Sequence, residues 1–475
     1  MSGSPAETGA VGEGDRGSMK SGLGSILKTS VPIVVDLSAQ IVMWTIEINL
    51  VSRIAPGLMQ RTYPGSGATG VDALTAVGNV VQIILLTFTA LLVFIFGATI
   101  VINRLLGENK RDEANHFLGQ SIFTTFIAAI GIALMWYLLA PFLFKFVLGT
   151  TAAVSAIGID YFRTLSFFAP FVILNVVAIG IVRGAGDTHL AMITSLLVNG
   201  LHLVLAVFLI FGLVFFPALG VRGSALAAGI AHTVGCIFTF SFILRGKSIL
   251  IFNWHDFKTI NGRTIRKVLG TGLPITLEQL AWMLGMTVVI GFSNRLGGVA
   301  AAAHIIILAF QRLFSILYQA FGMGALTLVG QRYGASEHDH ARRTTVQFFW
   351  LVGSVVFFLA AVIFFRARHF VLLYTSDEAV VEVGATALKV MAFVQIPKAL
   401  SYVYSYSLRG VGENRYPMYL ALFGVVFFEI VIGYNLAFTF GLSLVGLWLA
   451  QGIDEVFKVS LAAQRFYSRL ARHLR

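Results

Sequence analysis

The sequence contains few charged residues, only 12% of its 475 positions, and a single cysteine. A soluble domain carries about a quarter charged residues, so this chain could not cover a surface that faces water. Cys236 lies within an apolar run, which leaves no pairing for a disulfide or a thiol-based metal site, and no cofactor is expected. Residues 1–20 are polar and lack the apolar core of a signal peptide. We therefore predict a disordered tail at residues 1–24.

Long apolar runs fill most of the remaining chain. Apolar residues account for 57% of the sequence, and its mean hydropathy is +0.84. The runs are continuous over about twenty residues instead of alternating, which excludes a closed β-barrel and predicts an all-α polytopic membrane protein. Twelve transmembrane helices are predicted at residues 29–51, 72–101, 115–140, 157–181, 189–212, 220–244, 267–293, 298–330, 342–365, 382–407, 416–440 and 444–466.

Two loop sequences occur twice at almost the same spacing. The sequence Arg183-Gly-Ala-Gly-Asp187 is similar to Arg409-Gly-Val-Gly-Glu413, which lies 226 positions later. The loop that starts at Gly107 is likewise similar to the loop that starts at Gly334. The chain is therefore a duplicated unit of six spans. Because six is even, both halves enter the bilayer from the same side, so a pseudo-two-fold along the membrane normal relates them. Duplication of apolar spans is typical of a membrane transporter.

The duplication predicts the organisation of the chain. We expect an N-lobe of six helices at residues 25–244, a cytoplasmic linker at 245–266 and a C-lobe of six helices at 267–475. The equivalent segments around Pro32 and Pro274 are 242 positions apart, whereas the repeated Arg-Gly-x-Gly loops are 226 positions apart. The difference predicts an extra loop near residues 55–70 that only the first half contains.

Lysine and arginine gather on one face of the predicted topology, which collects both chain ends and the linker. Cytoplasmic loops carry an excess of these residues, so we predict a multi-pass protein of the cell (inner or cytoplasmic) membrane with both termini in the cytoplasm. The same asymmetry explains the net charge of +12. A nucleic-acid-binding protein would need these charges on one soluble domain, so no nucleic-acid partner is expected. The ten histidines are scattered without metal-ligand spacing, so no enzyme is expected.

Asp36, Glu47 and Glu278 lie within predicted spans, where an ionisable side chain needs a partner, a water-filled cavity or a function. Asp36 and Glu47 are eleven residues apart, close to three helical turns, and therefore share one helix face. Asp36 and Glu278 each follow a proline by four residues, so they are repeat equivalents, whereas the position that matches Glu47 is Val289. The unpaired Glu47 is the predicted coupling carboxylate. Asp36 and Glu278 could serve either transport or the fold.

Basic and aromatic residues also fall within the spans of the second half. Arg312 lies at a depth compatible with Glu278, so we expect these two to form an ion pair. Lys398 could neutralise Glu278, Glu382 or Glu429, or it could line a cavity, and Tyr402 could pack or line the cavity. In the first half His202 could titrate near physiological pH close to an acidic group.

Several motifs carry a resemblance to a known family. Pro32 opens the first span and Glu47 precedes Arg53 by six residues, Leu273-Pro-Ile-Thr-Leu-Glu-Gln279 opens the seventh, and the eighth holds Gly322-x-Gly-Ala325 and Val329-Gly-Gln331. With the repeated Arg-Gly-x-Gly loops, this pattern resembles the multidrug and toxic compound extrusion (MATE) family, in its prokaryotic DinF-like branch. The likeness covers about residues 24–468.

The resemblance implies two lobes around a central cleft that opens alternately to the outside and to the inside. It also implies export of organic cations in exchange for H⁺ or Na⁺. It places Glu47 at the first-span coupling carboxylate, matches Asn199 to a family asparagine, and adds Gln279 to the C-lobe polar network with Glu278. This chain has His202 and Ala206 where many relatives supply further oxygens, and Trp282 where another branch has an acid. The chain therefore offers few oxygen ligands for a Na⁺ site, which favours proton coupling.

The sequence thus predicts a monomeric antiporter that exports organic cations in exchange for protons, with Glu47, Asp36, His202 and Asn199 as coupling residues. Two alternatives remain open: a flippase for a lipid or lipid-linked oligosaccharide of the same superfamily, for which Arg312 and Lys398 would suit an anionic head group, and a Na⁺-coupled exporter.

Overall fold

The computed structural model describes residues 22–213, 216–258 and 261–471, and in these ranges the chain forms helices and no strands. The predicted tail lies outside the described part except at its end, where Leu23 already begins the first helix. The helices of the first half are α1 (Leu23–Ser52), α2 (Pro56–Thr62), α3 (Gly70–Gly107), α4 (Arg111–Phe142) with η2 (Leu143–Val147), α5 (Ala152–Ser166), α6 (Ala169–Gly184), α7 (Thr188–Phe211) and α8 (Val221–Leu244).

The second half repeats this series. After the short α9 (Trp254–Lys258) come α10 (Gly262–Arg295), α11 (Gly298–Gly334), α12 (His338–Leu372), α13 (Glu378–Gly410), α14 (Arg415–Phe423) with η3 (Gly424–Ile432) and η4 (Asn435–Thr439), and α15 (Ser443–Ala471). We call α1–α8 the N-lobe and α10–α15 the C-lobe.

The predicted spans correspond to helices in the described chain. Ten helices are long and apolar enough to cross a membrane, and the pair α5 and α6, bent by 67°, makes an eleventh. The twelfth, α15, does not reach that hydropathy because Asp454, Glu455 and Lys458 interrupt its apolar run. The bend falls at Phe167 and Phe168, just before Pro170, whose ring cannot continue the ladder of the preceding helix.

The extra loop of the first half is also confirmed. Between α1 and α3 the chain forms the short helix α2, whereas two residues suffice to join α10 to α11. The end of this loop caps the start of α3: the side chain of Thr69 accepts a hydrogen bond from the backbone N–H of Asp72, and the carboxylate of Asp72 accepts one from the backbone N–H of Thr69.

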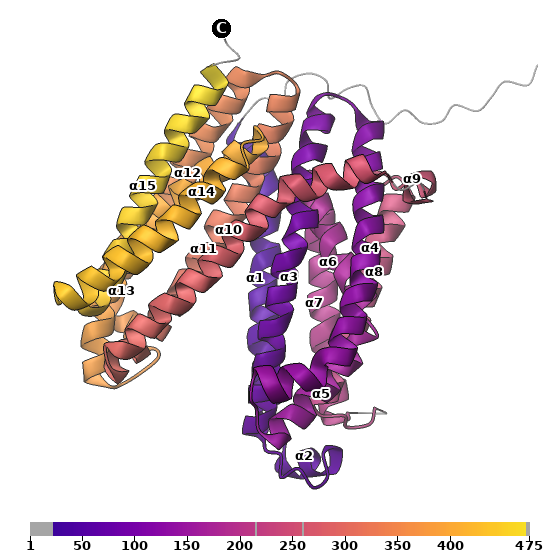
Figure 1. Cartoon of the computed structure of the whole chain (residues 1–475), viewed down its shortest axis with the longest axis vertical. Coiled ribbons are helices and arrows are strands. Elements are labelled where there is room, and N and C mark those ends of the chain that lie inside the picture. Colours follow the sequence, from indigo (N-terminus) through magenta and orange to yellow (C-terminus); the bar gives the residue numbers. More distant parts are fainter. Residues whose placement is uncertain (1–21, 214–215, 259–260, 472–475) are drawn as a thin grey trace, which may run out of the picture.

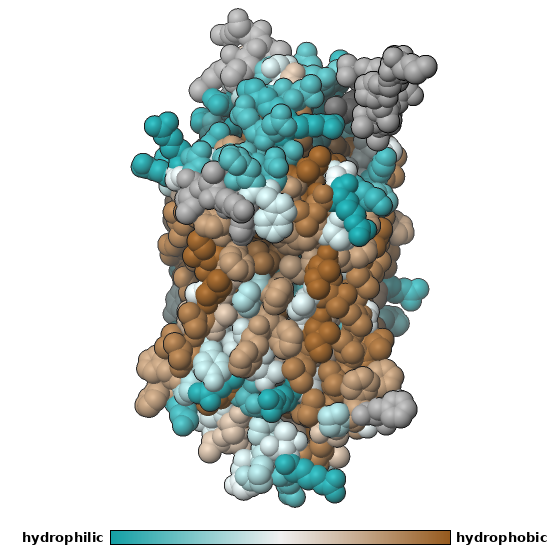
Figure 2. Space-filling view, turned by 90° about the vertical axis from the view of Figure 1, so that its right-hand side faces the viewer, coloured by the Kyte–Doolittle hydropathy of each residue, from teal (hydrophilic) through white to brown (hydrophobic). Residues whose placement is uncertain are grey.

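The two lobes meet at one end of the molecule and diverge towards the other (Figure 1). The end where they meet carries the start of α1, the linker with α9 and the end of α15 (Figure 1), and we call it the terminal end. Figure 2 shows an apolar belt between two hydrophilic ends. Large side chains such as Leu284, Phe358 and Phe365 are exposed in this protein, which water would penalise and lipid would not. It is a multi-pass membrane protein.

The seam between the lobes at the terminal end is a backbone contact between α3 and α11. A Cβ atom on Gly107 would lie 2.0 Å from the carbonyl oxygen of Gln331, and one on Gly334 would lie 2.3 Å from that of Arg104. Glycine is required at both positions, since any side chain would push the helices apart.

Polar and apolar contacts extend this seam. The side chains of Asn103 and Thr327, from opposite lobes, each donate a hydrogen bond of 2.8 Å to the carbonyl oxygen of Gly184. Next to these bonds lies an apolar cluster drawn from both lobes, made of Ile33, Phe96, Ile100, Ile275, Ala320, Met323, Leu326 and Tyr406. The terminal end is therefore sealed in this conformation.

Candidate coupling and cargo sites

The N-lobe holds a buried carboxylate among protonatable groups. Glu47 of α1 is 8% exposed, and its Oε1 accepts a short hydrogen bond from the hydroxyl of Ser224 on α8. Nε2 of His202, on α7, lies 3.4 Å from the same oxygen. Three helices thus converge on one carboxyl group, and the prediction that His202 approaches an acid is confirmed. The charge has little water to solvate it, so its protonation state depends on these few neighbours.

Further polar residues surround this group. His232 of α8 has its Nδ1 3.2 Å from the amide nitrogen of Asn175 on α6, and Tyr161 of α5 is buried close to Glu47. The amide of Asn199 donates a hydrogen bond of 3.3 Å to Ser195, and within the described part of the chain it makes no hydrogen bond to Glu47. Sequence reasoning missed Tyr161, Asn175 and Ser224, because isolated polar residues within a span give no signal of which helix face they occupy.

The two repeat-related acids form repeat-related ion pairs. Arg183 at the end of α6 donates to Asp36 at 2.5 Å, and Arg409 at the end of α13 donates to Glu278 at 2.6 Å. The predicted pair of Glu278 with Arg312 is therefore wrong. Arg312 is exposed on α11, and matching depth along two helices does not fix the rotation of either one. Asp36 thus connects α1 to the end of α6, and Glu278 connects α10 to the end of α13 in the same way.

The remaining predicted residues lie in the C-lobe. Gln279 is half-buried beside Glu278 on α10. Tyr402 stacks on Tyr406 with ring centroids 5.9 Å apart and lies 4.5 Å from the ring of Tyr318. Tyr406 in turn lies under the guanidinium group of Arg409, at 4.5 Å. Tyr402 therefore belongs to an aromatic stack that adjoins the inter-lobe seam.

Lys398 is enclosed in the C-lobe, where it is 1% exposed. Its Nζ lies 5.9 Å from the ring centroid of Trp282 and 6.0 Å from that of Tyr318. Its charged neighbours are Glu455, Glu429, Asp454 and Lys458. Of the carboxylates considered from the sequence, Glu429 is thus near Lys398, whereas Glu455 and Asp454 of α15 were missed.

Nearby, α15 supplies a second cluster of charge. Nζ of Lys458 lies 2.7 Å from Asp454 and 3.0 Å from Glu455, which also accepts a hydrogen bond of 2.6 Å from Ser401. Among the described residues, no group of three or more His, Cys, Asp or Glu side chains is placed to hold a metal ion.

The model of the MatE family matches residues 66–208 and 274–435, which is well over half of the chain and includes parts of both lobes. The chain belongs to the MATE family. Members of this family are transporters and not enzymes, so the prediction made from the motifs is confirmed.

Similar proteins match most of the chain. The uncharacterized transporter YisQ of Bacillus subtilis is 22% identical and the match covers 94% of each chain. The probable multidrug resistance protein NorM of Thermotoga maritima is 25% identical over 86% of each. A multidrug resistance MATE family transporter of the MOP superfamily, solved in an outward-facing conformation, has a TM-score of 0.83 and 20% identity, covering 95% of this chain and 96% of its own. The fold is therefore that of known MATE transporters.

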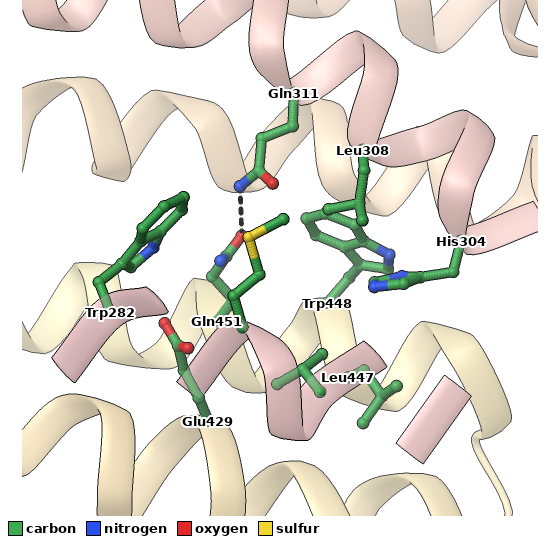
Figure 3. A pocket seen from close by; sticks show the side chains of 10 residues that line it. Trp282, His304, Leu308, Gln311, Glu429, Leu447, Trp448 and Gln451 are labelled. Atoms are coloured by element: carbon green, nitrogen blue, oxygen red, sulfur yellow. Dashed lines mark hydrogen bonds between the residues drawn. The ribbon is translucent and has the colours of Figure 1, made fainter. Parts of the chain in front are cut away.

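One cavity of this MATE protein lies inside the C-lobe. Figure 3 shows Trp282 and Trp448 on opposite sides of it, with Glu429 and the hydrogen-bonded pair Gln311 and Gln451 between them. The amide nitrogen of Gln311 donates to Gln451 at 3.2 Å. The cavity volume is about 30 Å³, room for little more than one water molecule. It is too small for a drug-sized cargo in this conformation.

Proposed function

We propose that this MATE transporter exports organic cations in exchange for protons and that Glu47 is its coupling carboxylate. The observation that carries the proposal is the burial of Glu47 with one hydroxyl donor and an imidazole 3.4 Å away. A carboxylate in that position can gain or lose one proton, and His202 can stabilise the ionised form. Such a group is suited to coupling because its charge changes within an apolar lobe.

The oxygen supply near Glu47 supports a proton over a sodium ion. Hard cations require several oxygen ligands. Beside the carboxylate, the described neighbours offer the hydroxyls of Ser224 and Tyr161, and the other close groups are the nitrogens of His202 and His232. Imidazole nitrogens exchange protons well and bind Na⁺ poorly.

The basic loops and the seam support an orientation for the transporter in the membrane. Arg104, Lys110, Arg183 and Arg332 lie at the terminal end, which by the excess of positive charge is proposed to face the cytoplasm, with both chain ends inside. The sealed seam between Gly107 and Gly334 then corresponds to the outward-facing state. Alternation requires the second state, in which this seam opens, and the cargo must bind the two states with different affinity.

The class of cargo is supported by the relatives and by the aromatic residues at the inter-lobe seam. Two relatives carry names as multidrug resistance proteins. The stack of Tyr318, Tyr402 and Tyr406 offers ring faces, which attract organic cations through their negative potential. Binding of a cation is proposed to compete with protonation of Glu47 through the movement of α1.

Vesicles that hold the purified protein test the proposal. Efflux of a fluorescent organic cation is measured with a pH gradient alone and with a Na⁺ gradient alone, for wild type, E47Q and E382Q. Glu382 is an exposed acid on α13 and serves as the matched control. The expected result is efflux driven by the pH gradient, retained in E382Q and lost in E47Q.

Other outcomes would change the assignment. Efflux driven only by the Na⁺ gradient would replace the proton by Na⁺ as the coupling ion. Absence of efflux under both gradients, with lipid transbilayer movement in the same vesicles, would favour the flippase. Retention of pH-driven efflux by E47Q at the wild-type rate would contradict the role of Glu47.

A further inference from the structure

The C-lobe contains a counterpart of the Glu47 site. Asn175 and Ser401 are 226 positions apart, as are His232 and Lys458, and this is the spacing of Arg183 and Arg409. Each pair is linked within its lobe: Asn175 bonds His232 directly in the N-lobe, whereas Ser401 and Lys458 both bond Glu455 in the C-lobe. Both clusters therefore lie at the same place in the duplicated fold.

The two clusters differ in how their positive groups are supplied. The N-lobe cluster has one carboxylate, Glu47, beside two imidazoles, which are neutral or charged as protons permit. The C-lobe cluster has three carboxylates, Glu429, Asp454 and Glu455, beside the ammonium groups of Lys398 and Lys458. A lysine side chain supplies a permanent positive charge, the ammonium group. A carboxylate beside neutral imidazoles is neutralised only when a proton or another cation binds from solution.

Lys398 is the least explained of these groups. Within the described ranges its Nζ has no hydrogen-bond partner, although the side chain is 1% exposed. The same is true of Oε1 of Glu429, which is 5% exposed and faces the cavity of Figure 3. An ammonium group that lies near two aromatic rings and within electrostatic range of Glu455 and Glu429 is in the surroundings that proteins use to bind amines. Its burial is tolerable only because Glu455 and Glu429 offset its charge.

We propose that the C-lobe core contains a site for one primary ammonium group, formed by Glu429, Glu455 and the rings of Trp282 and Tyr318, and that Lys398 fills it with its own ammonium. The cation of this site is the ammonium group of Lys398, which is part of the chain, so the C-lobe binds no cation from solution there. Exchange of a cation is then confined to the N-lobe. That division of labour rests on the proposed role of Glu47, but the occupancy of the C-lobe site does not.

The test removes the tethered amine and supplies a free one. K398A deletes three methylene groups and the ammonium, so n-propylammonium matches what is lost. The control is K389A, which removes an exposed lysine from the same helix. The unfolding midpoint of each purified full-length protein is measured in lipid nanodiscs with n-propylammonium, with 1-propanol and without additive.

The expected result is specific rescue. K398A unfolds roughly 5 °C or more below wild type because a buried carboxylate has lost its partner. Millimolar n-propylammonium raises its midpoint in a saturable manner, 1-propanol does not, and neither changes wild type or K389A. A midpoint of K398A equal to that of K389A, or an equal effect of the amine on all proteins, would overturn the proposal.

A second comparison isolates charge from volume. K398M keeps the bulk of the side chain but leaves three carboxylates with one ammonium group, and K398M/E429Q restores the wild-type excess of one carboxylate. The double variant is expected to unfold at a higher temperature, or to give a higher folded yield, than K398M. No gain in either quantity would contradict a counter-cation role for Lys398, even if K398A does not fold. Because neither assay measures transport, this inference and the role of Glu47 can fail separately.

Discussion

Arg409 reaches across 131 positions of sequence to donate a hydrogen bond of 2.6 Å to Glu278, and the pair repeats in the other lobe as Arg183 and Asp36. In each lobe the bond ties the end of the fourth span to the second quarter of the first. Two acids within spans are thereby paired with arginines at the ends of other spans, at matching places in the duplicated fold.

This pairing predicts a large cost when one partner is lost. R409M leaves Glu278 beside an apolar side chain, and we expect the free energy of unfolding to fall by about 3 kcal/mol. R409M/E278Q removes both charges and should recover most of the loss. R312M, which changes an exposed arginine, is the control. Denaturant unfolding of the purified proteins measures the difference, and equal stabilities of R409M and R312M would show that the pair is not structural.

The glycine seam predicts how the conformational equilibrium can be shifted. G334A places a methyl group 2.3 Å from the carbonyl oxygen of Arg104, so α3 and α11 must separate. We expect the terminal end to open and export to fall by roughly tenfold or more. G78A is the control, because nothing lies within 4 Å of a Cβ atom there.

Labelling of a buried cysteine measures this opening. Thr327 is 1% exposed at the seam, and the sole native cysteine, Cys236, is buried. A maleimide should label T327C faster in the G334A background than in the G78A background. Equal labelling rates would mean that the seam does not control access from the terminal end.

His202 predicts a specific defect in coupling. H202A removes the imidazole 3.4 Å from Glu47, so the ionised carboxylate loses the nearest group that can carry a positive charge. We expect proton-driven efflux to fall by roughly tenfold or more while the folded yield stays high. H189A removes an exposed histidine from the same helix and should transport as wild type. Equal efflux by the two variants would remove His202 from the coupling site.

The number of spans and their duplication can be predicted from the sequence. Both follow from hydropathy and from the repeated loops, and neither depends on how the helices pack. The sequence also separates Glu47, whose repeat position is Val289, from Asp36 and Glu278, which are repeat equivalents of each other. Helix rotation is a property of the packed structure, so the sequence cannot say that Glu278 faces Arg409 and not Arg312. For the same reason Ser224 and Glu455 were not predicted, although each lies in a predicted span.

α15 illustrates a further limit. Its hydropathy is low because it carries both charges of an internal ion pair, Asp454 and Lys458. In a sequence, such charges are typical of a surface that faces water, and only the structure shows that these two form an ion pair inside the lobe.

The most direct test of the central claim is proton release when cargo binds. Purified protein in weakly buffered solution with a pH-sensitive dye is mixed with ethidium, and the protons released are compared with the cargo bound. Wild type and E382Q should release protons with each cation bound, and E47Q should bind ethidium without release. Equal release by E47Q and wild type, or binding by wild type with no release, would contradict proton exchange at Glu47.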